Sequence, residues 1–206
     1  MREALAEAAG RPVSRETFRL IEAYVERLRQ AAVGHNLVAE STLKSVWSRH
    51  ILDSAQIVRF EGRNAGSWVD IGSGAGLPGM VIAALVDGPV TLVEPRRLRA
   101  EFLRSTIDTL GLAPRVTVTQ TKIERVDGQF DAITARAVGA LDRLIAMAQH
   151  LSGPETVWVL PKGKNAQSEL AQARRNWHCA ARVEKSCTDP DSDIVVLTKV
   201  GAIRKR

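Results

Sequence analysis

The chain has 206 residues, which is enough for one domain with its own core and too few for two ordinary domains. Hydrophobic residues make up 45% of it and charged residues 25%, a balance that excludes an intrinsically disordered chain. The formal net charge of +6 favours a polyanionic partner such as a nucleic acid, although a basic surface without such a partner is an equally open interpretation.

The N-terminal segment has the composition of a surface segment and not of a targeting sequence. Its charged side chains Arg2, Glu3 and Glu7 interrupt the apolar stretch that a signal peptide needs. Nowhere does the sequence approach the roughly 18 consecutive apolar residues of a membrane span. We therefore expect a cytoplasmic protein that does not enter a membrane.

Helical patterns fill the first part of the chain. From Ser14 to about Gln30, apolar residues recur at intervals of three and four, as they do on one face of an amphipathic helix. A second helical segment is expected from about Leu43 to Phe60. Because this region carries no strand signal, we expect residues 1–62 to form a helical N-terminal extension that packs on residues 63–206, within a single domain.

After the turn-forming residues 62–66, short aliphatic runs alternate with helical patterns. This alternation is typical of βαβ units and of a parallel sheet. The expected strands are Trp68–Ile71, Val90–Val93, Arg115–Thr119, Phe130–Thr134, Val157–Leu160 and Ile194–Lys199. The expected helices between them are Gly79–Leu85, Arg97–Leu110, Leu141–His150 and Ala166–Trp177.

A glycine-rich turn joins the first expected strand to a helix within Val69–Gly79. Glycine accepts a positive φ and lets a ligand approach the backbone, and the amides of the following helix then face that ligand. The glycines have the spacing G-x-G-x-G, at Gly72, Gly74 and Gly76, whereas a dinucleotide fingerprint needs a third glycine where Leu77 stands. The spacing resembles the first motif of class I methyltransferases, whose loop holds S-adenosylmethionine. Taken alone, the turn has about even odds of being structural.

The ends of later strands carry side chains that suit the same ligand. Glu94 ends the second strand, and one carboxylate can accept hydrogen bonds from both hydroxyls of a ribose. After the third strand, Ile123 can pack on an adenine ring and Glu124 can accept from its exocyclic amine. Arg136 follows the buried fourth strand and calls for an anionic partner, either a ligand carboxylate or an RNA phosphate. The alternatives are a solvated glutamate, an ordinary loop and a surface arginine.

Five short segments, in order and spacing, resemble the bacterial 16S ribosomal RNA guanine-N7 methyltransferase family. They span most of the chain, from about Asn36 to Lys164, and R-H-I-L-D-S and G-L-P-G are far more specific than G-x-G-x-G. The five segments are Arg49–Ser54, Gly72–Gly79, Phe102–Arg104, Ala135–Ala137 and Pro161–Gly163.

The resemblance implies a fold, a reaction and a ligand site. The fold is the α/β, Rossmann-like class I methyltransferase fold, with a mostly parallel seven-stranded sheet and helices on both faces. The reaction transfers a methyl group from S-adenosylmethionine to N7 of one guanine in the 530 loop of 16S ribosomal RNA. Carried onto this chain, the family's ligand contacts fall at Gly72, Leu77, the Ile123–Glu124 pair and Arg136. Gly74 and Glu94 complete the expected cofactor site.

Methylation at N7 makes few chemical demands on side chains. N7 of guanine has a free lone pair and no proton, so it can attack a sulfonium methyl group without a general base. We therefore expect no catalytic acid or base, only positioning. We also expect no metal, because Cys179 and Cys187 are too far apart for a zinc pair and the histidines lack ligand spacing.

The expected partner is 16S ribosomal RNA or the small ribosomal subunit, bound by a chain that we expect to be a monomer. Two other functions stay open: a class I methyltransferase that acts on a small molecule or a protein, and a non-catalytic RNA-binding protein of the same fold. The residues expected to contact RNA are Arg49, His50, Arg97, Arg99, Lys162 and Lys164, joined by Arg96 and the tail Arg204–Arg206.

Overall fold

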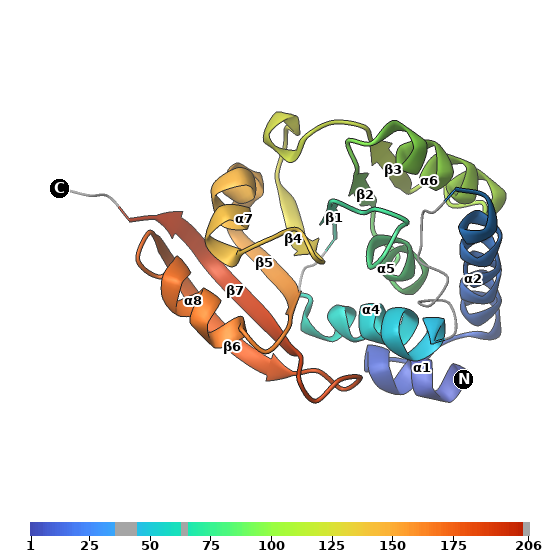
Figure 1. Cartoon of the computed structure of the whole chain (residues 1–206), viewed down its shortest axis with the longest axis horizontal. Helices are drawn as coiled ribbons and strands as arrows, with labels where there is room; N and C mark the ends of the chain where they lie inside the picture. Colours follow the sequence, from blue (N-terminus) through green and yellow to red (C-terminus); the bar gives the residue numbers. More distant parts are fainter. Residues whose placement is uncertain (36–44, 63–65, 204–206) are drawn as a thin grey trace.

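The computed structural model describes residues 1–35, 45–62 and 66–203, and a seven-stranded sheet runs through it (Figure 1). The strand order is β3-β2-β1-β4-β5-β7-β6. The first five strands of the chain pair in parallel, and β7 is antiparallel to both of its neighbours. The predicted mostly parallel seven-stranded sheet is confirmed. The strands are β1 (Trp68–Ile71), β2 (Val90–Val93), β3 (Val116–Thr119), β4 (Phe130–Ala135), β5 (Ser152–Lys162), β6 (Trp177–Lys185) and β7 (Asp193–Ala202).

Helices cover both faces of the sheet, so the central strands are apolar on both sides. One face carries α1 (Arg2–Ala9), α2 (Arg15–His35), the π-helical η1 (Trp47–Leu52), α4 (Asp53–Ala55), the 3-10 helix η2 (Gln56–Phe60), α5 (Gly79–Leu85) and α6 (Arg97–Thr109). The other face carries η3 (Ile123–Arg125), α7 (Leu141–Ala148), η4 (Gln149–Leu151) and α8 (Ala166–Ala173).

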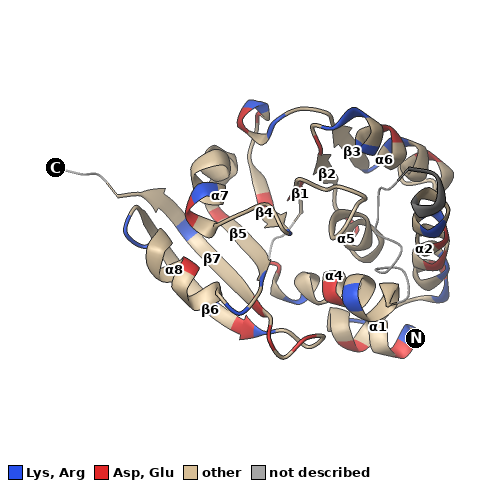
Figure 2. Cartoon of the chain, in the orientation of Figure 1, with Lys and Arg blue, Asp and Glu red and all other residues tan. Residues whose placement is uncertain are grey.

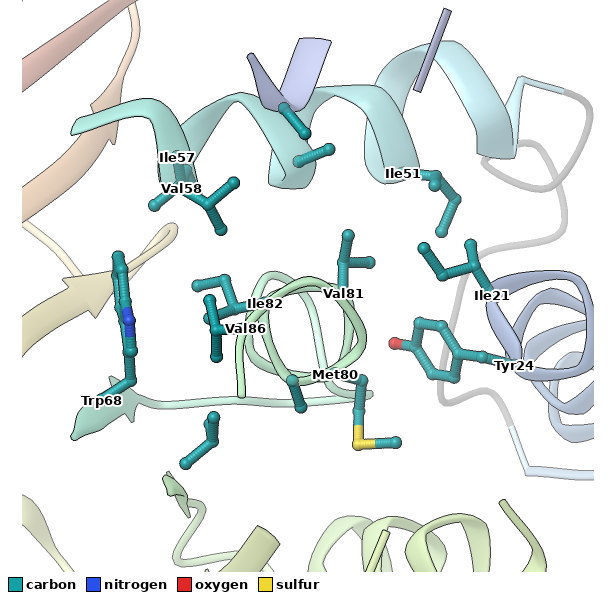
Figure 3. Close-up of a cluster of buried hydrophobic side chains, with 14 of the residues drawn as sticks. Ile21, Tyr24, Ile51, Ile57, Val58, Trp68, Met80, Val81, Ile82 and Val86 are labelled. Atoms are coloured by element: carbon teal, nitrogen blue, oxygen red, sulfur yellow. The ribbon is translucent and has the colours of Figure 1, made fainter. Parts of the chain in front are cut away.

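The helical N-terminal extension packs on α5, the helix that follows β1. The hydroxyl of Ser14 accepts a hydrogen bond from the amide of Thr17 at 3.0 Å, which caps the start of α2. Ile21 and Tyr24 of α2 then lie beside Val81 in the core (Figure 3). The extension therefore lies against the element that directly follows the glycine turn.

The extension differs in detail from its sequence pattern. The helix α1 was not predicted, and it ends at Gly10, whose φ of +65° is typical of a helix C-cap. The predicted helix Leu43–Phe60 begins outside the described residues and continues as π, α and 3-10 turns in succession. In the described part of the chain, no helix is both long enough and apolar enough to cross a membrane.

The C-terminal region corrects the expected element boundaries. The helix expected to reach Trp177 ends at Ala173, and residues 177–185 form the edge strand β6, which the sequence pattern did not reveal. Side chains on β6 alternate between partly buried and exposed, and its partly buried face packs beside α8. The β6–β7 hairpin brings Lys185 and Asp193 level with Lys162, the last residue of β5. The hairpin loop therefore lies at the edge where the parallel strands end.

Candidate functional site

The glycine turn between β1 and α5 is held by the end of β2. The amides of Gly72 and Ser73 both donate to the carbonyl of Val93, at 2.8 and 3.1 Å. Gly72 has a φ of +69°, and a Cβ placed on it would lie 2.9 Å from Cγ2 of Val138. Glycine is therefore required here both by conformation and by space. The predicted strand, turn and helix are confirmed.

Glu94 bridges two strand ends at this turn. It is 3% exposed, and its Oε2 accepts from the amide of Gly74 at 2.9 Å, while its Oε1 accepts from the amide of Arg96 at 2.9 Å. A carboxylate has about four acceptor positions, so roughly two remain for another molecule. The structure thus brings Glu94 and the glycine turn together, as their spacing in the sequence indicated.

Tyr24 of the extension holds the same turn from the other side. Its hydroxyl donates to the carbonyl of Ala75 at 2.9 Å, and a Cβ on Gly76 would lie 2.9 Å from that hydroxyl. Leu77 follows and packs against the same core cluster. Sequence reasoning missed Tyr24, because 51 residues separate it from its partner and nothing local indicates the contact.

Asp70, in β1, is a second residue that sequence reasoning missed. Its Oδ2 accepts from the amide of Gly79 at 3.0 Å, which fixes the start of α5. A Cβ on Gly79 would lie 2.6 Å from that oxygen, so this position also needs glycine. Burial raises the pKa of Asp70 to about 6, and the hydrogen bond from Gly79, which lowers this pKa, offsets only part of the effect. The sequence signal that could have identified Asp70 is a charged residue inside a strand pattern.

We expect Asp70→Asn to flatten the pH dependence of stability. A raised pKa means that the folded chain binds more protons than the unfolded chain between pH 4 and pH 6, so the free energy of unfolding falls as pH rises through this window. The loss reaches up to about 3 kcal/mol. Denaturant unfolding at pH 4, 5, 6 and 7 measures it. An equally steep decline in the variant would contradict the assignment to Asp70.

Ile123 and Glu124 begin η3, just beyond the end of β3. Ile123 is 6% exposed and belongs to the core cluster on the α7 side of the sheet, whereas Glu124 is exposed. Since β3 neighbours β2, these residues border the same sheet edge as Glu94. The edge thus presents the acidic side chain of Glu124, whereas most of the Ile123 side chain is buried in the core.

Arg136 follows β4 and faces the extension. Its Nη1 lies 3.3 Å from Oδ2 of Asp53, and both side chains are about one-fifth exposed, at 21% and 19%. Burial, followed by the charge of Arg136, lowers the pKa of His50 to about 4, so this imidazole is neutral at pH 7. The R-H-I-L-D-S segment and Arg136 therefore meet at one end of the sheet.

Asp53 also anchors the β6–β7 loop. Its Oδ1 accepts from Nε2 of Gln56 at 2.9 Å and from the hydroxyl of Thr188 at 3.0 Å. Gln56 in turn accepts from the amide of Cys187 at 2.8 Å through its Oε1. The hydrogen bond from Cys187 to Gln56 spans 131 residues of sequence, and the one from Thr188 to Asp53 spans 135. No local sequence pattern could reveal them.

Two pockets lie beside the contacts between Asp53 and the β6–β7 loop. One, of about 430 Å³, lies between Arg136 and the β6–β7 loop, and we call it the Asp53 pocket. The other, of about 570 Å³, opens between η1 and the same loop and includes Arg49 and His50. Asp53 and Ser192 line both pockets, so the two are adjacent. The Asp53 pocket is lined by Asp53, Gln56, Arg136, Ala137, Gly139, Pro161, Lys162, Gly163, Glu169, Ser186, Ser192, Asp193 and Ile194.

The predicted RNA contacts fall into different environments. Arg49 and Lys164 are exposed. Arg99 is half-buried, and its Nη1 lies 3.9 Å from the position of a Cβ on Gly74, at the glycine turn. Arg97 is exposed and pairs with Glu101 at 2.7 Å on α6. Arg97 and Arg99 thus lie on α6. Arg49 lines the second pocket, and Lys164 follows Gly163, which lines the Asp53 pocket.

Lys162 differs from these because its charge is already paired. Its ammonium donates to the carbonyl of Gly139 at 2.8 Å and to Glu169 at 2.9 Å, and its side chain is 10% exposed. The tail Arg204–Arg206 lies outside the described residues. Among the residues that are described, no group of three or more His, Cys, Asp or Glu side chains could hold a metal ion.

Solved structures of known methyltransferases share this fold. A glycopeptide N-methyltransferase, MtfA, in complex with S-adenosylmethionine aligns with a TM-score of 0.58 at 11% identity, covering 71% of this chain and 92% of that one. A methyltransferase from Aquifex aeolicus, described as SAM-dependent, aligns with a TM-score of 0.58 at 13% identity, covering 75% and 92%. At these identities the likeness shows the fold alone, and it confirms the predicted Rossmann-like methyltransferase fold.

Sequence comparisons are more specific. A family model described as rRNA small subunit methyltransferase G matches residues 17–195. A protein of that name from Zymomonas mobilis subsp. mobilis is 43% identical over 197 residues, which cover 91% of this chain and 88% of the relative. Another of that name, from Novosphingobium aromaticivorans, is 48% identical over 165 residues, covering 78% and 71%. The match spans the glycine turn, the R-H-I-L-D-S segment and both pockets.

Proposed function

The chain belongs to the rRNA small subunit methyltransferase G family, and from this membership we propose that it transfers a methyl group from S-adenosylmethionine to N7 of one guanine in 16S ribosomal RNA. The observation that carries the proposal is the bridge between Glu94 and the glycine turn. This bridge holds a carboxylate with spare acceptor positions beside Gly74, where no atom lies nearer than 3.9 Å to the position of a Cβ.

The residues at the turn fit the nucleoside part of the cofactor. At Gly74 no atom lies nearer than 3.9 Å to the position of a Cβ, so the nucleoside can approach the backbone there, while Gly72 supplies the positive φ of the turn. The free acceptor positions of Glu94 match the two hydroxyls of the ribose. Leu77 borders the same turn. We assign these four residues to the cofactor, together with the flanking contacts described next.

The flanking residues fit the two ends of the cofactor. We assign Ile123 to the adenine ring, which would contact the small exposed part of this side chain, and exposed Glu124 to the exocyclic amine as its acceptor. Arg136 offers a guanidinium for the carboxylate of the methionine part, because its contact to Asp53 is long at 3.3 Å and can be exchanged. The bound cofactor supplies an electrophilic methyl group on sulfur.

The proposed reaction requires the chain to position the guanine and the cofactor, and it requires no proton transfer. N7 of guanine carries a lone pair and no proton. Holding the nucleophile in line with the methyl group can account for roughly 7–11 kcal/mol of a barrier. We therefore assign the glycine turn, Glu94 and Arg136 to the placement of the cofactor, and no side chain to a general base.

The test of this proposal uses one RNA with two bases. A fragment of 16S ribosomal RNA is prepared with guanine or with 7-deazaguanine at the target position, and methyl transfer is measured with mapping of the product by mass spectrometry. We expect 7-methylguanine in the first RNA and no transfer to the second, which lacks the nucleophilic nitrogen. Transfer to both RNAs would overturn the assignment to N7. Transfer to neither, with protein or small molecules accepting the methyl group, would favour the first alternative function.

RNA binding should weaken steeply with salt. Lys and Arg residues are prominent on α6 (Figure 2), and Arg49 and Lys164 are exposed near the two pockets. We expect a log–log slope of about −0.7 for each phosphate contacted on single-stranded RNA. Arg49→Ala should make the slope shallower by about 0.7. Filter binding at salt concentrations from about 50 to about 300 mM measures the slopes of the wild type and of Arg49→Ala.

The control is Arg29→Ala, which removes an equal charge from the exposed face of α2, where Arg29 lies 3.8 Å from Glu26. It should leave the slope unchanged. A flat salt response of the wild type would contradict a phosphate-binding edge altogether.

Three further properties stay predictions. We propose that residues 1–62 and 63–206 form one domain, since core cluster residues such as Ile21 and Trp68 come from both parts. A cytoplasmic location and a monomeric state also stay expectations. Sedimentation of the purified chain at several concentrations tests the monomer.

A further inference from the structure

The Asp53 pocket adjoins the proposed cofactor site. Arg136, at the end of β4, lines it, and Val138, two residues on, touches the space above Gly72. The ends of β5 and of β6 and the start of β7 complete its wall, at the edge where the parallel strands end. Its volume of about 430 Å³ can admit one nucleotide base with its sugar.

The charges that line this pocket do not suit a phosphate. Acidic side chains there outnumber basic ones, with Asp53, Glu169 and Asp193 facing Arg136 and Lys162. The ammonium of Lys162 is already used by Gly139 and Glu169. The spare capacity of the pocket is therefore for accepting hydrogen bonds, which suits a molecule that presents N–H groups.

Asp53 is the one of these three acidic residues that lines both pockets, and its carboxylate has unused acceptor positions. Of about four on its carboxylate, Gln56 and Thr188 occupy two at 2.9 and 3.0 Å. Arg136 makes only a 3.3 Å contact to Oδ2, and one position is free. Gln56 and Thr188 both donate to Oδ1, so it is Oδ2 that can accept two hydrogen bonds once the Arg136 contact is exchanged.

Guanine presents two adjacent donors, N1–H and the 2-amino group, on one edge of the ring, and N7 lies on the opposite edge. We propose that Asp53 binds these two donors and so selects guanine as the base to be methylated. This inference rests on the proposed function, because it names how the same site recognises its substrate. Binding by that edge leaves N7 unobstructed, whereas adenine would set the lone pair of its N1 against the carboxylate.

The test compares RNA fragments with guanine or inosine at the target position. Inosine lacks the 2-amino group and keeps N7, so the reaction stays possible with either base. We expect the wild type to methylate the guanine RNA roughly 5- to 150-fold faster than the inosine RNA, the range for losing such a contact. In Asp53→Asn the donors Gln56 and Thr188 hold the amide oxygen in the place of Oδ1, so an NH2 group that cannot accept replaces Oδ2. This variant should treat the two RNAs within about 2-fold of each other.

Thr188→Val is the matched control. It removes the Thr188 hydrogen bond to Asp53 but keeps the carboxylate, so the preference for guanine over inosine should persist. A purely structural role of Asp53 would lower both rates and leave their ratio unchanged. If Asp53→Asn methylates neither RNA, the ratio is taken from equilibrium binding of the two RNAs.

The outcomes separate the two proposals. Equal rates of the wild type on guanine and inosine, or an unchanged preference in Asp53→Asn, would overturn the role of Asp53 and leave methylation at N7 intact. Absence of methylation of the guanine RNA by the wild type would overturn the proposed function itself.

Discussion

Gly72→Val should abolish measurable binding of S-adenosylmethionine, with an affinity loss of more than about 100-fold. The native φ of +69° is costly for a β-branched residue, by roughly 1–3 kcal/mol. In addition, the new Cβ would lie 2.9 Å from Val138, and relieving that overlap costs roughly a further 1–3 kcal/mol. Both costs fall on the turn that carries the proposed site. Isothermal titration calorimetry measures the affinity.

Gly111→Val separates backbone strain from damage to the site. Gly111 has nearly the same φ, +67°, and nothing lies within 4 Å of the position that its Cβ would take. It lies beyond the end of α6, two residues past Thr109 and away from the glycine turn. We expect a loss of stability in thermal unfolding and cofactor affinity close to that of the wild type. Affinity of Gly72→Val within about 10-fold of the wild type would remove the turn from the cofactor site.

The sequence was most informative where local chemistry dictates local structure. The turn at Gly72 was predicted because positive φ and close approach of a ligand both demand glycine, and the structure shows the turn where the pattern put it. Glu94 was placed beside it because parallel strands end at one edge, and its hydrogen bond to Gly74 confirms their proximity. In each case a few neighbouring residues carry the whole constraint.

Elements that depend on tertiary pairing could not be predicted in the same way. β6 is an edge strand whose outer face is solvent-exposed, so its composition lacks the aliphatic run that marked the inner strands. Its register comes from β7 and not from its own residues. The short π and 3-10 turns of the extension likewise follow from packing, because their residues have no distinctive propensity for them.

The part of the site around Asp53 shows the same limit. The R-H-I-L-D-S segment was singled out by resemblance, but the contacts of Asp53 with Arg136 and Thr188 cross 83 and 135 residues of chain. Such contacts depend on how the extension and the β6–β7 loop meet over the sheet, which no periodicity encodes. For the same reason the internal pairing of Lys162 with Glu169 was not foreseen, and the lysine was expected to face RNA.

Glu94→Ala should weaken S-adenosylmethionine binding by about 100-fold or more. The carboxylate offers two acceptor positions to the ribose, and hydrogen bonds to a charged group contribute about 1.5–3 kcal/mol each. The same substitution also leaves the amides of Gly74 and Arg96 without their acceptor, which loosens the turn that must stay in place. Calorimetric titration with S-adenosylmethionine and with S-adenosylhomocysteine measures the loss, which should be alike for the two because both carry the ribose.

Two variants separate ribose binding from support of the turn. Glu94→Gln keeps one side-chain oxygen, so its affinity should lie between those of the wild type and Glu94→Ala. Asp131→Asn alters a carboxylate with a similar bracing role, since Asp131 accepts from the amide of Ser67 at 2.7 Å. Asp131 stands near the start of β4, at the opposite edge of the sheet, so its loss should lower stability and leave cofactor affinity unchanged. If Glu94→Ala bound the cofactor as tightly as Asp131→Asn does, the acceptor for the ribose would have to be sought elsewhere on this edge.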